Sequence, residues 1–179
     1  MKKNGYSIKE IRSREISRNP DYDFKDSKYF IDKYEAGNGI NYFIECASPD
    51  RKANFGFIRL RITNSSFFDE LKDKGLIREL HVYNYVKSFS NNSTSLSTQH
   101  LGIGKTLIKK AEEISKKHSK KGMAVISGVG VEDYYLKQGY YEGDYYLLKD
   151  FEMSNILKNI LYFIVFYVLL ILLIGYFLD

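Results

Sequence analysis

The stretch QHLGIGKTL, residues 99–107, combines residue types that suit phosphate binding. Gly102 and Gly104 stand two apart at the start of a run of helix-forming residues, and Lys105 and Thr106 follow directly. Glycines let a ligand approach the backbone closely, and the first N–H groups of a helix have no intrahelical acceptor. Because these N–H groups and the positive end of the helix dipole attract anions, we expect a diphosphate here, with Lys105 adding a positive charge.

The spacing of the glycines excludes two common nucleotide motifs. It lacks the third glycine of the dinucleotide fingerprint, and no G-K-[ST] ending stands at the P-loop spacing. Two glycines two apart also occur as simple turn residues. The motif alone therefore leaves a phosphate site and an ordinary turn open.

Cysteine and histidine are too few for disulfide or metal chemistry. Cys46 is the only cysteine, which excludes an internal disulfide, a cysteine-built zinc site and a cysteine-ligated iron–sulfur cluster. It lies in the strand-like run NYFIECA, where a lone cysteine packs as a small apolar side chain. The histidines, His81, His100 and His118, are scattered, so we expect no metal site.

Length and composition predict one globular domain. The chain has 179 residues, of which 44% are hydrophobic and 16% aromatic, and this excludes intrinsic disorder. The net charge of +5 favours an anionic partner such as nucleic acid, a phosphorylated cofactor or an acidic membrane face. The first thirty residues are charged throughout, so we expect no secretory signal peptide.

The elements before the glycine motif alternate between helix and strand patterns. Residues 27–36 show aromatic residues at helical spacing and stop at Gly37-Asn38-Gly39, which predicts a helix that ends there. Residues 6–18 fit a strand or a short amphipathic piece, and the choice stays open. The β-rich runs 40–47 and 55–62 are joined by SPDRKAN, which predicts an antiparallel hairpin.

The second half predicts the elements that hold the motif. In order they are a loop or short helix over 67–74, a strand over 76–83, a mobile surface loop over 86–98, an amphipathic helix from the motif to near Gly122, a buried strand of a mixed sheet over 123–128, a short helix over 132–138, and a strand or hairpin over 140–149.

The C-terminal tail predicts a membrane anchor. Residues 160–178 carry no charge, and at about 1.5 Å per residue a helix of this length spans most of a bilayer core. Lys149 and Lys158 precede this segment and only Asp179 follows it, which favours a cytosolic N-terminal part. We therefore expect a tail-anchored, single-pass protein with a domain over 1–150, a linker over 151–159 and a transmembrane helix.

Several sequence words resemble a known family. LIRELHVY, QHLGIGKTL, MAVISGVG and EDYYLKQGYY follow the element order of the acetyl-CoA-dependent N-acetyltransferase (GNAT) superfamily. More closely, IRELHVY, QHLGIG, AVISGVG and YYLKQGY resemble the C-terminal acetyltransferase domain of the Elongator complex catalytic subunit. With IRSREIS, FIDKYEAGNGINYFIE and FGFIRLRI, the resemblance covers about residues 8–149. It implies an α/β fold, in which helices flank a mixed, twisted sheet that is split by a coenzyme cleft.

The resemblance also implies an acetyl-CoA site. The pantetheine arm would lie along the predicted strand, held by backbone groups, and the diphosphate on the glycine motif. The implied cofactor-binding residues are Glu79, Leu80, His81, Val82, Gln99, Gly102, Ile103, Gly104, Lys105, Thr106 and Tyr135. The His81 side chain would act either as a second base or as a structural histidine.

Two residues would carry the catalysis that the resemblance implies. Tyr135 matches the tyrosine that often protonates the departing thiolate in this superfamily, although Tyr134 and Tyr135 also fit as core aromatics. The Glu79 carboxylate would accept a proton from an attacking amine or water, or only pair with a base such as Arg78 or Arg61.

The sequence departs from the Elongator subunit in ways that affect function. It has no radical S-adenosylmethionine domain and no cysteine cluster, and Ser13 stands where that family tends to have a cysteine. We therefore expect a stand-alone acetyltransferase that acts at a membrane surface on an amine of a protein, RNA or small molecule.

Two other functions stay open. One is a non-catalytic, membrane-anchored module that binds acetyl-CoA or tRNA through a basic surface; the other is a membrane adaptor that recruits a partner. The basic surface would consist of Arg12, Arg14, Arg18, Arg51, Lys52, Arg59 and Arg61.

Overall fold

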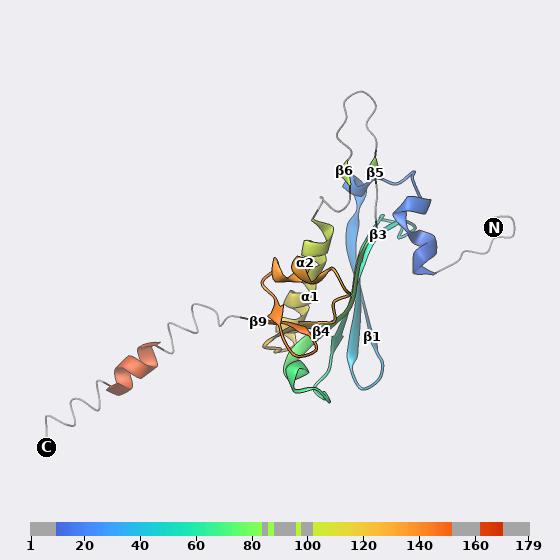
Figure 1. The fold of residues 1–179 in the computed structure, drawn as a ribbon. Coiled ribbons are helices and arrows are strands. Elements are labelled where there is room, and N and C mark those ends of the chain that lie inside the picture. The colour runs from blue at the N-terminus through green and yellow to red at the C-terminus, as the bar shows by residue number, and fades with distance from the viewer. Residues whose placement is uncertain (1–9, 84–85, 88–95, 98–101, 152–161, 170–179) are drawn as a thin grey trace, which may run out of the picture.

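The computed structural model describes residues 10–83, 86–87, 96–97, 102–151 and 162–169 (Figure 1). The strands are β1 (Lys28–Glu35), β2 (Ile40–Ala47), β3 (Asn54–Ile62), β4 (Lys74–Val82), β5 (Val86–Lys87), β6 (Leu96–Ser97), β7 (Gly122–Val125), β8 (Tyr141–Glu142) and β9 (Leu147–Asp150). The helices are α1 (Ile103–Lys117) and α2 (Glu132–Leu136), with 3-10 turns η1 (Ile11–Arg14), η2 (Ile16–Arg18), η3 (Phe24–Asp26) and η4 (Asp69–Leu71). One seven-stranded sheet has the order β1-β2-β3-β4-β7-β9-β8, and β5 pairs with β6 separately.

The first four strands form an antiparallel meander that includes one corrected prediction. Residues 28–35 are not a helix but strand β1, which pairs with β2 along its whole length. Gly37 and Asn38 both have φ of 55°, the paired positive values that a tight hairpin turn between twisted strands requires. The Gly37-Asn38-Gly39 signal is therefore a hairpin turn and not a helix end. The predicted hairpin of β2 and β3 is confirmed.

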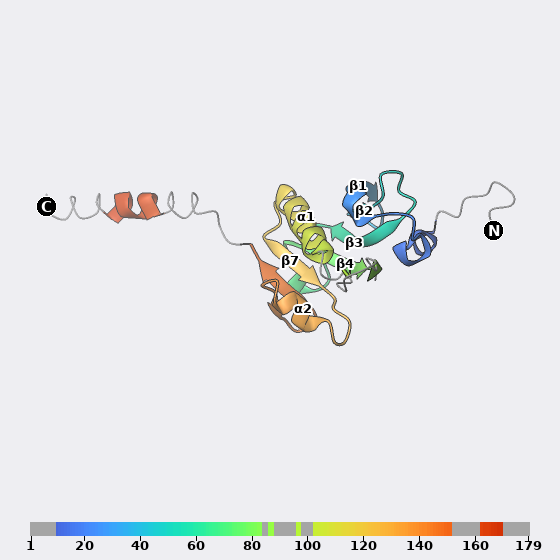
Figure 2. The ribbon, with the colours of Figure 1, turned by 90° about the horizontal axis from the view of Figure 1, so that it is seen from above.

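The remaining strands make the sheet mixed, as predicted. Strands β4 and β7 are parallel, and α1 provides the crossover that a parallel pair needs. Helix α1 packs against β2, β3, β4 and β7 with the apolar face that its sequence predicts. The predicted short helix is α2, and the predicted last hairpin is β8 with β9. Figure 2 shows α1 on one side of the sheet and the N-terminal 3-10 turns on the other.

The hydrophobic core lies between α1 and the sheet. Phe55, Ile58 and Leu107 are fully buried, and the chain's cysteine, Cys46, is also buried, as expected. The predicted short element over 67–74 contains η4, and residues 11–18 of the undecided N-terminal segment form η1 and η2. Most of the predicted loop over 86–98 lies outside the described residues.

The structure contradicts the predicted membrane anchor. Of residues 160–178, the structure describes helical residues 162–169, and the others, like most of the predicted linker, lie outside the described part. At about 1.5 Å per residue this helical piece is far shorter than the roughly 30 Å of a bilayer core. Within the described ranges, no helix has the length and apolar character to cross a membrane. The predicted single-pass localisation is therefore wrong.

Candidate active site

Strand β4 loses its partner on one edge halfway along. Its parallel pairing with β7 joins Lys74–Ile77 to Gly122–Val125 and stops there. From Arg78 to Val82 the strand continues beside β3 alone, and no described strand pairs with its other edge. Backbone N–H and C=O groups on this edge need hydrogen-bonding partners, so the split edge suits a ligand that offers amide groups.

A β-bulge decides which way the side chains of this segment point. Arg59 pairs with Glu79 but the next residue, Leu60, pairs with Ile77, so Arg78 is the extra residue. Val82 contacts α1 at Gly104, and the alternation along a strand then turns Glu79 and His81 to the opposite face of the sheet.

The Glu79 carboxylate pairs with Arg59, which is neither of the two partners expected from the sequence. It lies 3.5 Å from the guanidinium of Arg59, and both side chains are about half exposed. The expected partners were Arg78 and Arg61, but Arg61 donates hydrogen bonds to the carbonyl oxygens of Ala36 and Gly37. The cross-strand register places Arg59 opposite Glu79, and a bulge of this kind leaves no signal in the sequence.

Helix α1 begins at the glycine motif, as predicted. Gly102 precedes the first helical residue with φ of 69°, a left-handed conformation that favours glycine, and the space where its Cβ would stand is open. The N–H and the Oγ1 of Thr106 both donate to the Gly102 carbonyl oxygen, at 3.0 and 3.2 Å. The N–H groups of Ile103, Gly104 and Lys105 therefore precede the first helical hydrogen bond and can bind a ligand.

Three elements meet at Gly104. A Cβ on this residue would collide with the hydroxyl of Tyr134 from α2 and would lie 3.5 Å from a methyl group of Val82 on β4. The Ile103 side chain packs into the core, while Lys105 is exposed. Gln99 lies outside the described residues. The structure thus brings the split edge of β4, the start of α1 and α2 together.

The two tyrosines of α2 lie in different surroundings. Tyr135 is 5% exposed between the rings of Tyr134 and Tyr140, and this burial raises its pKa to about 12. Tyr134 is half-buried with its hydroxyl directed at Gly104, and burial raises its pKa too. Neither hydroxyl has a hydrogen-bond partner in the described part of the chain. The sequence pointed to Tyr135, and not to Tyr134, as the candidate acid.

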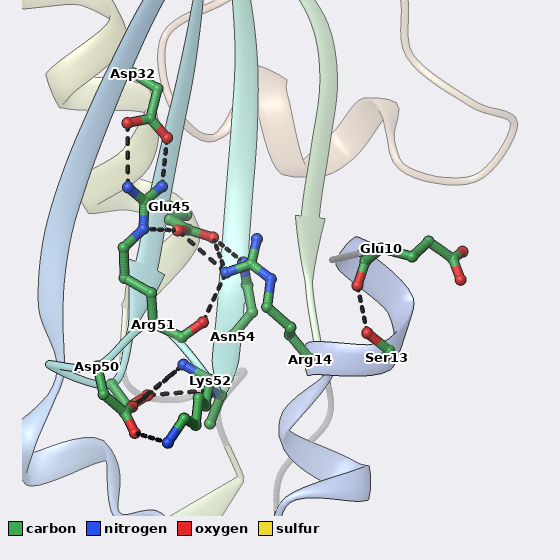
Figure 3. Close-up of polar contacts among 11 residues, drawn as sticks. Glu10, Ser13, Arg14, Asp32, Glu45, Asp50, Arg51, Lys52 and Asn54 are labelled. Carbon is green, nitrogen blue, oxygen red and sulfur yellow. Dashed lines mark hydrogen bonds and ion pairs between the residues drawn. The ribbon is translucent and has the colours of Figure 1, made fainter. Parts of the chain in front are cut away.

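Two arginines of the basic surface expected from the sequence, Arg14 and Arg51, are held in ion pairs. Figure 3 shows the buried carboxylate of Glu45, which Arg14 approaches to 3.0 Å. Arg51 Nε and Asn54 Nδ2 each donate to Glu45 at 2.6 Å, and Arg51 also pairs with Asp32. This network fastens η1 to the sheet, so these arginines serve the fold.

Comparison with known proteins agrees with the resemblance found in the sequence. The chain is 34% identical over 161 residues to the tRNA uridine(34) acetyltransferase of Methanocaldococcus infernus, covering 84% of the chain and 29% of that protein. It is 36% identical over 153 residues to Elongator complex protein 3 of Danio rerio, covering 81% of the chain and 28% of that protein. No protein-family model matches.

A solved structure supports the fold as well. The Methanocaldococcus infernus Elp3 with an N-terminal deletion superposes with a TM-score of 0.73 at 32% identity, covering 84% of the chain and 37% of the solved chain. The chain is thus a homologue of these acetyltransferases, and it spans less than a third of the length of the two relatives named above.

Proposed function

We propose that the chain binds acetyl-CoA at the split edge of β4 and transfers the acetyl group to an amine. One observation carries the proposal: three features meet at Gly104. They are the edge of β4 that pairs with no described strand, the free N–H groups at the start of α1, and the Tyr134 hydroxyl, which has no partner in the described part of the chain. Such a site fits a carrier whose amide-bearing arm lies along a strand and whose diphosphate meets helix N–H groups. The names of the relatives support an acetyltransferase.

The binding residues of the proposal are those that the sequence implied. The backbone of Glu79, Leu80, His81 and Val82 would hold the pantetheine arm. The N–H groups from Gly102 to Lys105 would hold the diphosphate together with Gln99, and Thr106, whose N–H donates to the Gly102 carbonyl oxygen, would lie beside it. The Lys105 ammonium is exposed beside this helix start, where it favours an anion.

The proposed reaction uses one base and one acid. The amine nitrogen attacks the thioester carbonyl carbon, the carbon–sulfur bond breaks, and the Glu79 carboxylate accepts the proton that the amine loses. A tyrosine hydroxyl gives its proton to the departing thiolate, and both groups then recover through water. Tyr135 stays the acid predicted from the sequence, while the direction of the Tyr134 hydroxyl supports Tyr134 as the second candidate.

The proposed acceptor is RNA. The relatives include enzymes that are named for acetylating uridine 34 of tRNA, and this supports tRNA over a protein or a small molecule. Because uracil carries no amino group, the amine of the proposed reaction would be the exocyclic amino group of another RNA base. A non-catalytic module that binds acetyl-CoA would show the same coenzyme affinity without turnover.

Two measurements test the proposal. Calorimetric titration with acetyl-CoA should show micromolar binding, and release of free thiol should report transfer. The matched pair Tyr134→Phe and Tyr135→Phe decides between the acids: the variant that lowers the rate about 100-fold or more identifies it. Absence of heat at high acetyl-CoA concentration would contradict the proposed function. Equal rates of both variants and the wild type would show that neither tyrosine acts as the general acid.

A further inference from the structure

Strand β1 ends the seven-stranded sheet, and one of its edges has no strand beside it. It pairs with β2 in regular register along all eight residues, and no described strand lies on its other side. Ile31 is 49% exposed and Tyr34 is 42% exposed. Edge strands are commonly protected by shortness, proline, a bulge or charge, and of these β1 has only charged residues. The edge is therefore suited to pairing with another strand.

The hairpin turn shows which backbone groups face this edge. The N–H of Ala36 donates to the carbonyl oxygen of Gly39 at 3.0 Å. Because hydrogen-bonded and non-hydrogen-bonded pairs alternate along an antiparallel ladder, the even-numbered residues of β1 bond to β2. The N–H and C=O groups of the odd-numbered residues from Tyr29 to Glu35 therefore point outward, and within the described ranges no strand bonds to them.

The chain that leads into β1 turns away from this edge. Phe24 of η3 packs edge-on against Phe55 of β3, with ring centroids 5.6 Å apart, and β3 is two strands in from β1. Ser27, between η3 and β1, is extended, with φ of −67° and ψ of 150°. An extended segment that begins at Ser27 is thus open to a partner strand.

We propose that two copies of the chain associate through β1, antiparallel, about a two-fold axis at Phe30. A two-fold pair uses the same patch on both copies, so the patch must complement itself. In this register Lys28 of each copy lies opposite Asp32 of the other, and Tyr29 lies opposite Ile31. The two Phe30 rings meet at the axis, and the two sheets continue as one.

The ionic contact of this pairing uses a charge that is free in the single chain. Lys28 is exposed and has no ion-pair partner among the residues that the structure describes. Asp32 is paired with Arg51 and is about half exposed, so its carboxylate can accept a second cation. Opposite charges that face each other across two strands stabilise the pair, whereas like charges destabilise it.

Charge and strand length select the axis at Phe30 over its alternatives. An axis at Asp32 or at Lys33 sets like charges opposite each other. An axis at Ile31 sets Asp32 opposite an aromatic ring, where it gains no ionic partner. An axis before Phe30 brings η3 into the ladder, and an axis at Tyr34 brings in the hairpin turn, so both shorten the ladder.

This association leaves the proposed coenzyme site open. The split edge belongs to β4, which lies three strands from β1 in the sheet. A pair of chains would therefore carry two separate acetyl-CoA sites. The association does not depend on the proposed function, and a chain that binds no acetyl-CoA would pair in the same way.

Charge-swap variants of the full chain test the pairing by sedimentation velocity over a concentration series. The wild type should shift from monomer to dimer as its concentration rises. Lys28→Glu and Asp32→Lys should each raise the dissociation constant about tenfold, because both ion pairs of the dimer become repulsive. An equimolar mixture of these two variants should recover the wild-type affinity, since opposite charges then face each other again. Lys33→Glu is the matched control, because Lys33 lies opposite Ser27 in this register.

Cysteine cross-linking tests the register itself. The native Cys46 is buried, so an introduced cysteine reports the contact. Phe30→Cys should form an interchain disulfide under mild oxidation. Residues opposed in a non-hydrogen-bonded pair have Cα atoms about 4.5 Å apart, within the span of a disulfide. Tyr34→Cys is the control on the same face of β1 and should cross-link about tenfold more slowly or less.

Four outcomes would overturn the inference. They are a wild-type chain that stays monomeric, a mixture of the swapped variants that fails to recover affinity, a Lys33→Glu loss equal to that of Lys28→Glu, and Tyr34→Cys cross-linking as fast as Phe30→Cys. Circular dichroism of each variant checks that the strands are retained. Recovery in the mixture also shows that both swapped variants fold.

Discussion

At the scale of single residues, the buried carboxylate of Glu45 is the most constrained charge of the described sheet. It is fully buried, and Arg14, Arg51 and Asn54 satisfy its two oxygens. A buried ion pair need not stabilise a fold relative to apolar residues, but breaking one leaves charges unpaired. Arg14 and Arg51 therefore have a structural role in this network.

We expect Glu45→Gln to lower the free energy of unfolding by about 3 kcal/mol, because Arg14 loses its charged partner and Arg51 keeps only Asp32. Urea denaturation measures this loss. Glu79→Gln is the matched control: its pair with Arg59 is about half exposed to water, so the stability should change by less than about 1 kcal/mol. Similar losses in both variants would contradict the structural role of Glu45.

Alanine substitutions of Gly104 and Gly122 distinguish an effect on acetyl-CoA binding from an effect on stability. A Cβ on Gly104 meets the far end of the Tyr134 side chain, which can turn aside, whereas a Cβ on Gly122 meets the backbone carbonyl of Lys149, which cannot. Gly104→Ala should therefore keep the melting temperature and weaken acetyl-CoA binding by tenfold or more. Gly122→Ala should lower the melting temperature. Calorimetry of both variants checks the contrast, and a wild-type acetyl-CoA affinity in Gly104→Ala would count against the site.

At the scale of elements, the parting of β4 from β7 creates the site. The strands pair over Lys74–Ile77 only, and the bulge at Arg78 turns the following side chains. A regular β4 would keep Glu79 on the face that α1 covers, because side chains alternate along a strand. In the proposed reaction, the bulge would therefore turn the carboxylate toward the acceptor.

Hydrogen exchange measures the split edge directly. We expect the amides of Arg78–Val82 that point away from β3 to exchange fast in the free chain, because no described strand binds them. Acetyl-CoA should slow them by tenfold or more. The amides of Lys74–Ile77 that bond to β7 serve as the internal control and should stay slow. Unchanged exchange at saturating acetyl-CoA would place the arm elsewhere.

At the scale of the whole molecule, we expect tyrosines with raised pKa values to limit stability at alkaline pH. Burial raises the pKa of Tyr29 and of Tyr135 to about 12, and it also raises that of Tyr140. A raised pKa means that the folded state holds the proton more tightly than the unfolded state does. The associated stability is therefore complete below about pH 10, the pKa of a free tyrosine, and is lost as pH rises further.

We expect the free energy of unfolding to fall between about pH 10 and pH 12. Denaturation at stepped pH, followed with the ultraviolet absorbance of tyrosinate, checks this. Tyr135→Phe should reduce the slope, since one titrating group is removed. A flat stability over this range would contradict the burial of these hydroxyls.

The sequence by itself determined the local elements and the chemistry of the motif. Runs rich in β-forming residues predicted β2, β3 and β4, the amphipathic pattern predicted α1, and the glycines predicted a helix start with free N–H groups. These features depend on residues close together in the chain, so a local pattern is enough. The same local logic misled at residues 28–35, because Gly37-Asn38 serves a hairpin as well as a helix end.

Only the tertiary structure decided which side chains share the site. Tyr134 and Tyr135 are neighbours in α2, yet one points to Gly104 and the other into the core, because about 100° separates successive helical residues. The pairing of Glu79 with Arg59 depends on a bulge between strands that lie far apart in sequence. Such choices follow from packing and register, which arise only when distant segments meet.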